Sequence, residues 1–157
     1  MVVTNAAGSV TSTATLSQFG PTFSLLDTTH PAGVLLTPDG SGAYGGGTYD
    51  LLGPSGAFSF KTRPVRKGET VELFGTGFGP TTPPVPAGKA FSGAAPTANQ
   101  VTVTVGGVSQ TLTAYEVGAG LYQINVAIPS NVASGDIPLL ASVGGMQTPG
   151  SVVITVQ

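Results

Sequence analysis

The chain contains no cysteine, no tryptophan and a single histidine, His30, among its 157 residues. Without cysteine it forms no disulfide, presents no thiolate nucleophile and holds no sulfur-ligated zinc. With one imidazole it has few of the side chains that enzymes use for proton transfer or nucleophilic attack. These absences predict a protein that is not an enzyme and that has no cofactor.

Charge is also scarce, because charged residues make up 8% of the chain and the net charge is −2. Exposed helix faces are normally built from Glu, Lys and Arg, so this scarcity argues against a helical protein. Nucleic-acid binding requires many Lys and Arg to neutralise phosphates, so we expect no nucleic-acid partner. Low charge with abundant Thr, Ser and Gly is typical of secreted bacterial surface modules, and we expect an extracellular or cell-surface location.

Long apolar runs are absent as well. No stretch reaches the roughly 18 apolar residues that a membrane-spanning helix needs, so we expect no membrane span. The start of the chain, from Met1 to Asn5, has no basic segment followed by an apolar run and does not resemble a signal peptide. Because the chain begins within a strand-like pattern, we expect it to be a fragment of a longer protein, with any targeting signal upstream.

Apolar residues recur with a period of two, which is typical of strands. The clearest example is Val101 to Val105, followed by the turn Gly106-Gly107 and a returning segment from Val108 to Tyr115. Residues 121–128 alternate in the same way, and residues 136–143 with 152–156 form another hairpin-like pair. Turn signals between strands at this spacing predict an all-β fold, either a sandwich or a small barrel.

The strand pattern divides the chain into two parts. We predict a β-sandwich of about seven strands over residues 61–157, preceded by an N-terminal hairpin and an irregular β segment over residues 1–60 that packs on it. The hairpin sequence, residues 2–16, has the same spacing as residues 139–156. The hairpin therefore belongs either to this domain or to the end of a preceding module.

Three segments resemble a known family. They are Gly68 to Gly79, which contains the sequence GTGFG, then Val101 to Val108, and then Gly120 to Pro129. These resemble the opening strand, the next hairpin and the following strands of IPT/TIG domains, which are immunoglobulin-like modules. The same phrases, in this order, resemble a C-terminal domain that recurs in secreted proteins of Solibacter-type acidobacteria. The resemblance implies an immunoglobulin-like sandwich and an extracellular location, and it carries no catalytic motif.

The strongest candidate for a binding surface is a basic segment. Four of the five Lys and Arg residues fall within seven positions, namely Lys61, Arg63, Arg66 and Lys67. Such a cluster on a weakly charged surface can attract an acidic polysaccharide or another anionic partner. Nearby aromatic residues that can stack on sugar rings are Tyr44, Tyr49, Phe58 and Phe60. The structural alternative is a solvated connector that protects an edge strand from pairing.

Other candidate sites are better explained as structure. The glycine-rich run Gly75 to Gly79 is followed by prolines, so it ends a strand and does not begin a phosphate-binding helix. His30 lacks a nucleophile with the spacing of a hydrolase and is predicted to be an exposed or partly packed loop residue.

The acidic residues show no metal or catalytic spacing. Asp27, Asp39 and Asp50 lack the clustering that calcium needs, so turn chemistry is the better interpretation. Glu69 and Glu72 point to opposite faces of a strand and cannot form a glycosidase pair with each other. Together with Glu116, they are predicted to be solvated strand residues.

These observations favour a non-catalytic structural or interaction module of a larger secreted or surface protein, of the adhesion type. The alternative is a carbohydrate-binding module that uses the loop aromatics and the basic segment 61–67. An enzyme with an unrecognised site is a third hypothesis. Possible partners are a protein, a polysaccharide or a second copy of the chain, joined through edge strands.

Overall fold

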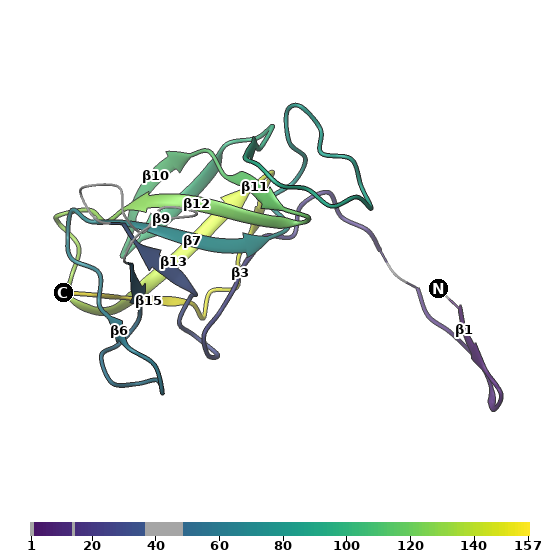
Figure 1. The fold of residues 1–157 in the computed structure, drawn as a ribbon, viewed down its shortest axis with the longest axis horizontal. Coiled ribbons are helices and arrows are strands. Elements are labelled where there is room, and N and C mark those ends of the chain that lie inside the picture. Colours follow the sequence, from purple (N-terminus) through teal and green to yellow (C-terminus); the bar gives the residue numbers. More distant parts are fainter. Residues whose placement is uncertain (1, 14, 37–48) are drawn as a thin grey trace.

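The computed structural model describes residues 2–13, 15–36 and 49–157. Within these ranges the regular structure consists of strands and turns, with no helix, so the predicted all-β class is confirmed. The strands form two large sheets and one small hairpin (Figure 1). Several sheets packed together in this way make a β-sandwich.

The larger sheet contains eight described strands. In spatial order they are β6 (Thr62–Arg63), β5 (Asp50–Leu52), β4 (Gly33–Leu35), β7 (Thr70–Thr76), β12 (Leu121–Ala127), β11 (Tyr115–Gly118) and β8 (Ala95–Pro96), while β3 (Thr22–Phe23) also pairs with β7. All of these pairings are antiparallel except the one between β5 and β6.

The smaller sheet is built around one long strand. Its strands are β10 (Val108–Leu112), β9 (Val101–Val105), β13 (Gly135–Val143), β14 (Met146–Gln147) and β15 (Val153–Val156), which pairs with the first part of β13. The predicted hairpin at residues 101–115 is confirmed, because β9 and β10 pair across Gly106-Gly107. Both glycines have positive φ, which a two-residue hairpin turn of this kind requires.

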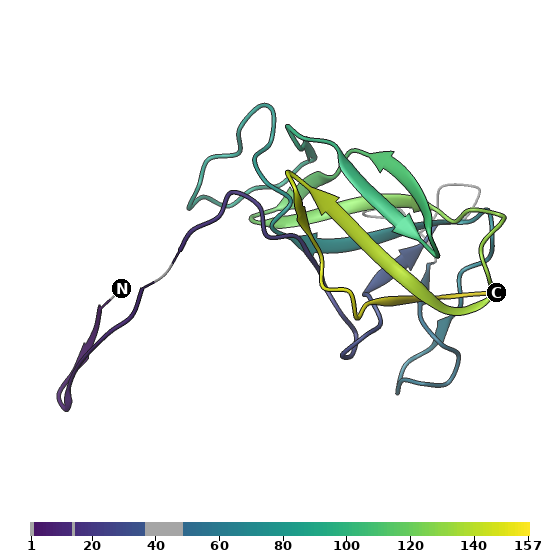
Figure 2. The same cartoon turned by 180° about the vertical axis from the view of Figure 1, so that it is seen from behind.

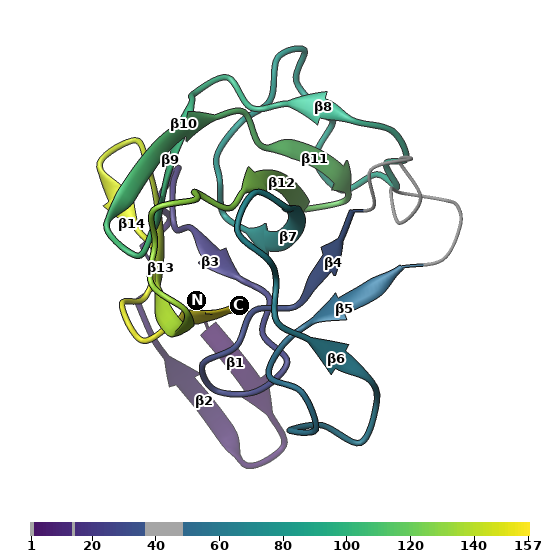
Figure 3. The ribbon, with the colours of Figure 1, turned by 90° about the vertical axis from the view of Figure 1, so that its left-hand side faces the viewer.

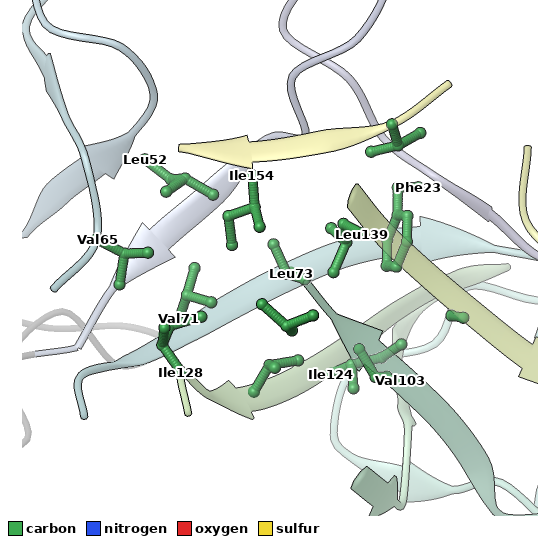
Figure 4. Close-up of a cluster of buried hydrophobic side chains, with 14 of the residues drawn as sticks. Phe23, Leu52, Val65, Val71, Leu73, Val103, Ile124, Ile128, Leu139 and Ile154 are labelled. Atoms are coloured by element: carbon green, nitrogen blue, oxygen red, sulfur yellow. The ribbon is translucent and has the colours of Figure 1, made fainter. Parts of the chain in front are cut away.

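The core lies between the two sheets, which face each other in the end-on view (Figure 3). Alternation explains its composition: Tyr122, Ile124 and Val126 of β12 are buried, while Asn125 between them is exposed. Aliphatic side chains from β7, β13 and β15 point toward one another in the close-up, among them Leu73, Leu139 and Ile154 (Figure 4).

The segment before residue 61 contributes to this core. Strands β3, β4 and β5 join the larger sheet beside β7, and Phe23, Leu35 and Leu52 are buried. The predicted boundary between residues 60 and 61 therefore passes through the larger sheet, and the residues on its two sides share one core. The sequence predicts an irregular β segment here but not its partners, because strands of two or three residues carry too little pattern to show what they pair with.

The N-terminal hairpin is different from the rest of the chain. It consists of β1 (Val2–Asn5) and β2 (Gly8–Thr11), which pair with each other as a separate two-stranded sheet. All eight strand residues are exposed, and Figures 1 and 2 show the hairpin lying away from the sandwich. The hairpin was predicted to pack on the sandwich, and that part of the prediction is wrong.

Candidate functional site

The basic segment lies at the edge of the larger sheet, where β6 pairs with β5. Lys61, Arg66 and Lys67 are exposed, as expected for a surface that attracts an anionic partner. Arg63 is different, because only 20% of its side chain is accessible. The four basic residues therefore do not form one continuous free cationic surface.

Arg63 is held by two carboxylates. Its Nε donates to Asp50 Oδ2 at 2.7 Å, and its Nη1 and Nη2 donate to Glu69 Oε2 and Oε1 at 2.8 and 3.2 Å. The hydrogen bond to Glu69 raises the pKa of Arg63, burial opposes this, and the bond to Asp50 adds to the increase. This network joins β5 and β6 to the start of β7, so Arg63 has a structural role.

The two carboxylates respond in the same sense. The hydrogen bond from Arg63 lowers the pKa of Asp50. Burial raises the pKa of Glu69, but the bonds from the Arg63 side chain and the Arg66 backbone outweigh it, so the pKa is lowered overall. The turn role predicted for Asp50 and the solvated role predicted for Glu69 are both wrong, because each is a partner of Arg63.

The aromatic residues near this segment are arranged unequally. Tyr44 lies outside the described residues. Tyr49 is exposed next to Asp50. Phe58 and Phe60 stack with their ring centroids 5.3 Å apart and their planes 11° apart, and Phe60 keeps an exposed surface. Tyr49 and Phe60 are thus the described aromatic rings of this region that a ligand can reach.

His30 is a partly packed loop residue, as predicted. Its Nδ1 lies 2.8 Å from Asp27 Oδ2 and its Nε2 lies 3.4 Å from Asp136 Oδ2. Asp27 also caps the turn, because its Oδ1 accepts hydrogen bonds from the backbone N–H groups of Thr29 and His30 at 2.7 Å each. The predicted turn role of Asp27 is therefore confirmed. Asp39 lies outside the described residues.

The histidine joins two parts of the fold. Asp27 and His30 belong to the loop between β3 and β4, while Asp136 is on β13 and accepts a 2.6 Å hydrogen bond from Thr155 of β15. Burial lowers the pKa of His30, but the two aspartates together outweigh burial, so the pKa is raised overall. Because both aspartates favour the imidazolium form, this cluster ties the loop to the smaller sheet.

Two glutamates predicted to be solvated are buried. Glu72 on β7 is 3% exposed and accepts a 2.9 Å hydrogen bond from Gln123 of β12. Glu116 on β11 is 8% exposed and accepts a 2.9 Å hydrogen bond from the N–H of Gly120. The period of two predicts which face of its strand each glutamate lies on. It does not predict burial, because the segments that cover that face come from distant parts of the chain.

The glycine-rich run ends a strand, as predicted. Gly75 lies within β7, and the turn that follows it contains Gly77 and Gly79, both with positive φ. Gly77 O accepts a 3.0 Å hydrogen bond from the N–H of Gly20, so the turn is tied to the segment before β3.

Two other features concern metal binding and membrane crossing in the described part of the chain. No group of three or more His, Cys, Asp or Glu side chains there is placed to hold a metal ion. The same residues contain no helix of the length and apolarity needed to cross a membrane.

The N-terminal hairpin carries two exposed aliphatic side chains directly opposite each other. Val3 and Val10 are cross-strand partners and are 59% and 72% exposed. Directly opposite residues of an antiparallel pair lie on the same face, so these valines form an exposed apolar pair. On the other face, Thr4 and Ser9 are joined by a 2.7 Å hydrogen bond between their hydroxyls.

Comparisons with known proteins identify no relative. No protein-family model matches the chain, and neither do any curated protein or any solved structure.

Proposed function

We propose that the chain is a non-catalytic structural and interaction module of a larger bacterial protein that is secreted or displayed at the cell surface. Its contact with a neighbouring module is made by the hairpin β1–β2. The observation that carries this proposal is the exposed apolar pair of the hairpin, in which Val3 and Val10 are 59% and 72% exposed. Burial of apolar surface is favourable in free energy, and no described residue of the chain covers these two valines. A neighbouring module that covers them is therefore stabilised by the contact.

The use of the polar side chains supports a structural role. Arg63 is paired with Asp50 and Glu69, and His30 is paired with Asp27 and Asp136. Each of these groups connects separate elements of the fold. The paired charged side chains thus stabilise the fold of the module. Contacts with other molecules would be made by its exposed side chains.

The strand order supports an immunoglobulin-like topology and, with it, the proposed IPT/TIG relationship. Strands β7, β12 and β11 are adjacent in one sheet, and β10, β9 and β13 are adjacent in the other, where β15 also pairs with β13. If β7, β12 and β11 are taken as strands B, E and D, and β9, β13 and β15 as strands C, F and G, the order agrees with that of immunoglobulin domains. In addition, Val65 forms a parallel bridge with Val156 of the last strand. Long-range amide contacts between these strands, measured by NMR, test the assignment.

The interaction role is tested by site-specific photo-crosslinking on intact producing cells. A photoreactive amino acid replaces Val10 in the hairpin or, as a matched control, Met146, which is also exposed but lies in the turn region of β14. We expect crosslinks to a defined protein or neighbouring module from position 10 and fewer from position 146. Equal yields from both positions would contradict the role of the hairpin.

The location is tested on the same cells. An antibody against the sandwich should label intact cells or be depleted by the culture medium. Labelling that requires permeabilised cells would overturn the extracellular assignment.

A second candidate function is carbohydrate binding. It is favoured by the exposed rings of Tyr49 and Phe60 beside the exposed side chain of Lys61, since aromatic rings and cations together suit acidic sugars. Titration with acidic and neutral polysaccharides tests it, with Phe60→Ala expected to weaken binding. An absence of binding at millimolar sugar would exclude it.

A further inference from the structure

A cavity of about 320 Å³ lies beneath the loop that follows β7. Its walls come from the proline-rich part of this loop and from the turn between β11 and β12, and Figure 1 shows the loop extending beyond the strands. The volume is at the lower end of the range for small-ligand sites. The cavity therefore suits a single side chain or a molecule of similar size.

The cavity contains a carboxylate without a counterion. Glu116 is 8% exposed, and its Oε1 accepts one hydrogen bond, from the N–H of Gly120. Among the described residues, no Lys, Arg or His nitrogen lies within 4.0 Å of this carboxylate. Its Oε2 is not one of the fully buried oxygens that lack a partner, so a ligand in the cavity can reach it. A carboxylate that lines a cavity and has no cation beside it is suited to a cationic partner.

The aromatic residue Tyr122 forms the wall of the cavity next to Glu116. Tyr122 lines the cavity, and its hydroxyl donates a hydrogen bond to Gly79 O, while its ring packs against Phe78 of the core. Burial and the negative charge of Glu116 raise the pKa of Tyr122, so the phenol is neutral and the two groups are electrostatically close. Tyr122 is therefore held in place as an uncharged wall of the cavity beside Glu116.

One stretch of the cavity wall is apolar and conformationally restricted. Pro80, Pro84, Val85 and Pro86 line the cavity. Proline fixes φ, so this part of the loop loses little conformational freedom when a ligand binds. An apolar stretch of wall opposite a carboxylate fits a chain of methylene groups that ends in a cation.

We propose that this cavity binds the side chain of a lysine on a partner protein, with the Glu116 carboxylate accepting from the ammonium group and the proline walls packing on the methylenes. An ammonium needs one carboxylate oxygen, which Oε2 supplies, whereas an arginine fork uses both. A calcium ion needs six to eight oxygens, far more than one carboxylate provides. A neutral sugar supplies no cation for this carboxylate.

Lys89 provides an internal test of this assignment. It also lines the cavity but is exposed and forms no ion pair with Glu116 within 4.0 Å. As a positive charge at the rim, it repels an incoming ammonium. The proposed lysine site therefore predicts opposite effects from two substitutions. Removal of the Glu116 carboxylate weakens lysine binding, and removal of the Lys89 ammonium strengthens it.

The experiment is an NMR titration of the full chain with Nα-acetyl-lysine methylamide, followed at the Gly120 amide. We expect a saturable shift, at least about tenfold weaker binding for Glu116→Gln, and about twofold tighter binding for Lys89→Ala. The matched control is Glu72→Gln, the same substitution on another strand of the sheet, which should bind as the original chain does. Nα-acetyl-norleucine methylamide should give no saturable shift.

Several results would overturn the proposal. They are equal binding of the norleucine compound, unchanged binding by Glu116→Gln, or tighter binding of the corresponding arginine compound. If Glu116→Gln does not fold, salt dependence in the original chain decides instead. Affinity should fall between about 0.05 and 0.5 M NaCl, and an affinity independent of salt would exclude an ion pair.

The lysine site rests on the proposed interaction role and names the chemistry of one partner. The two proposals fail separately, because the titration measures the cavity alone and the crosslinking at Val10 measures the hairpin alone.

Discussion

The guanidinium group of Arg63 binds the carboxylate of Glu69 at two points, with Nη1–Oε2 and Nη2–Oε1 distances of 2.8 and 3.2 Å. The same guanidinium donates from Nε to Asp50 Oδ2. A residue of the edge strand β6 thus connects β5 to the start of β7. The two-point geometry is specific to arginine, because lysine has a single point charge.

Substitution of Arg63 should therefore destabilise the sandwich. Arg63→Gln leaves Asp50 and Glu69 without their shared cation, and we expect a loss of about 2 kcal/mol, below the range for fully buried pairs because Asp50 is partly exposed. Urea unfolding measures the change. Lys61→Gln removes an exposed positive charge of the same segment and should change stability by less than about 0.5 kcal/mol. Equal effects would show that the Arg63 network has no structural role.

Two glutamates close together in the sequence should respond oppositely to the same substitution. Burial raises the pKa of Glu72, so its ionised form destabilises the fold as the pH rises through that pKa, above 4.5. The pKa of Glu69 is lowered, so its ionised form stabilises the fold, and this contribution is lost as the pH falls through the lowered pKa.

At neutral pH, Glu72→Gln should therefore raise the free energy of unfolding, by up to about 1 kcal/mol. Glu69→Gln should lower it by about 2 kcal/mol. Unfolding in urea from about pH 4 to about pH 7 measures both, and the gain from Glu72→Gln should shrink toward the acidic end. A loss of stability in Glu72→Gln at neutral pH would contradict the burial effect.

The single histidine predicts a pH dependence. The pKa of His30 is raised above its usual 6.5, so the pairing with Asp27 and Asp136 stabilises the fold fully below about 6.5. That contribution is lost as the pH rises through the raised pKa. We expect a lower urea midpoint at about pH 8.5 than at about pH 5.5.

The variant His30→Gln isolates this effect. Because His30 is the single histidine of the chain, the urea midpoint of the variant should differ less between the two pH values. NMR titration of the His30 ring gives the pKa directly. A value below 6.5 would show that burial outweighs the two aspartates.

The strand-ending turn depends on glycine at position 77. Gly77 has φ of +76°, and a Cβ atom there would overlap the carbonyl group of Gly20. Gly77→Ala should therefore cost roughly 3 kcal/mol, from the combined backbone strain and steric overlap. Gly56 has the same φ of +76° with open space around it, so Gly56→Ala should cost only about 1 kcal/mol. Urea unfolding compares the two, and equal losses would remove the steric contribution.

The long strands could be predicted because their periodicity is a local property. Val101, Val103 and Val105 alternate with threonines, and the same residues are buried in the structure. The partners of the short strands β3, β4 and β5 could not be predicted in this way, although the sequence predicts a β segment there. Their place beside β7 depends on pairing with residues distant in the sequence.

The candidate binding surface was predictable only as a composition. Clustering of Lys and Arg within residues 61–67 is visible in the sequence, but the neutralisation of Arg63 depends on Asp50 and Glu69 being brought to it. The cavity at Glu116 was missed altogether. An isolated Glu between Tyr115 and Val117 looks like a solvated strand residue, and its burial comes from contact with a loop some 30 positions earlier.

The sequence alone determined that this protein is an all-β sandwich with little charge and no thiol chemistry, because composition and a period of two are set by neighbouring residues. The tertiary structure decided which charges are paired, which glutamates are buried and which valines stay exposed. Those properties depend on long-range packing, since the energy of a charge or an apolar side chain is set by what surrounds it.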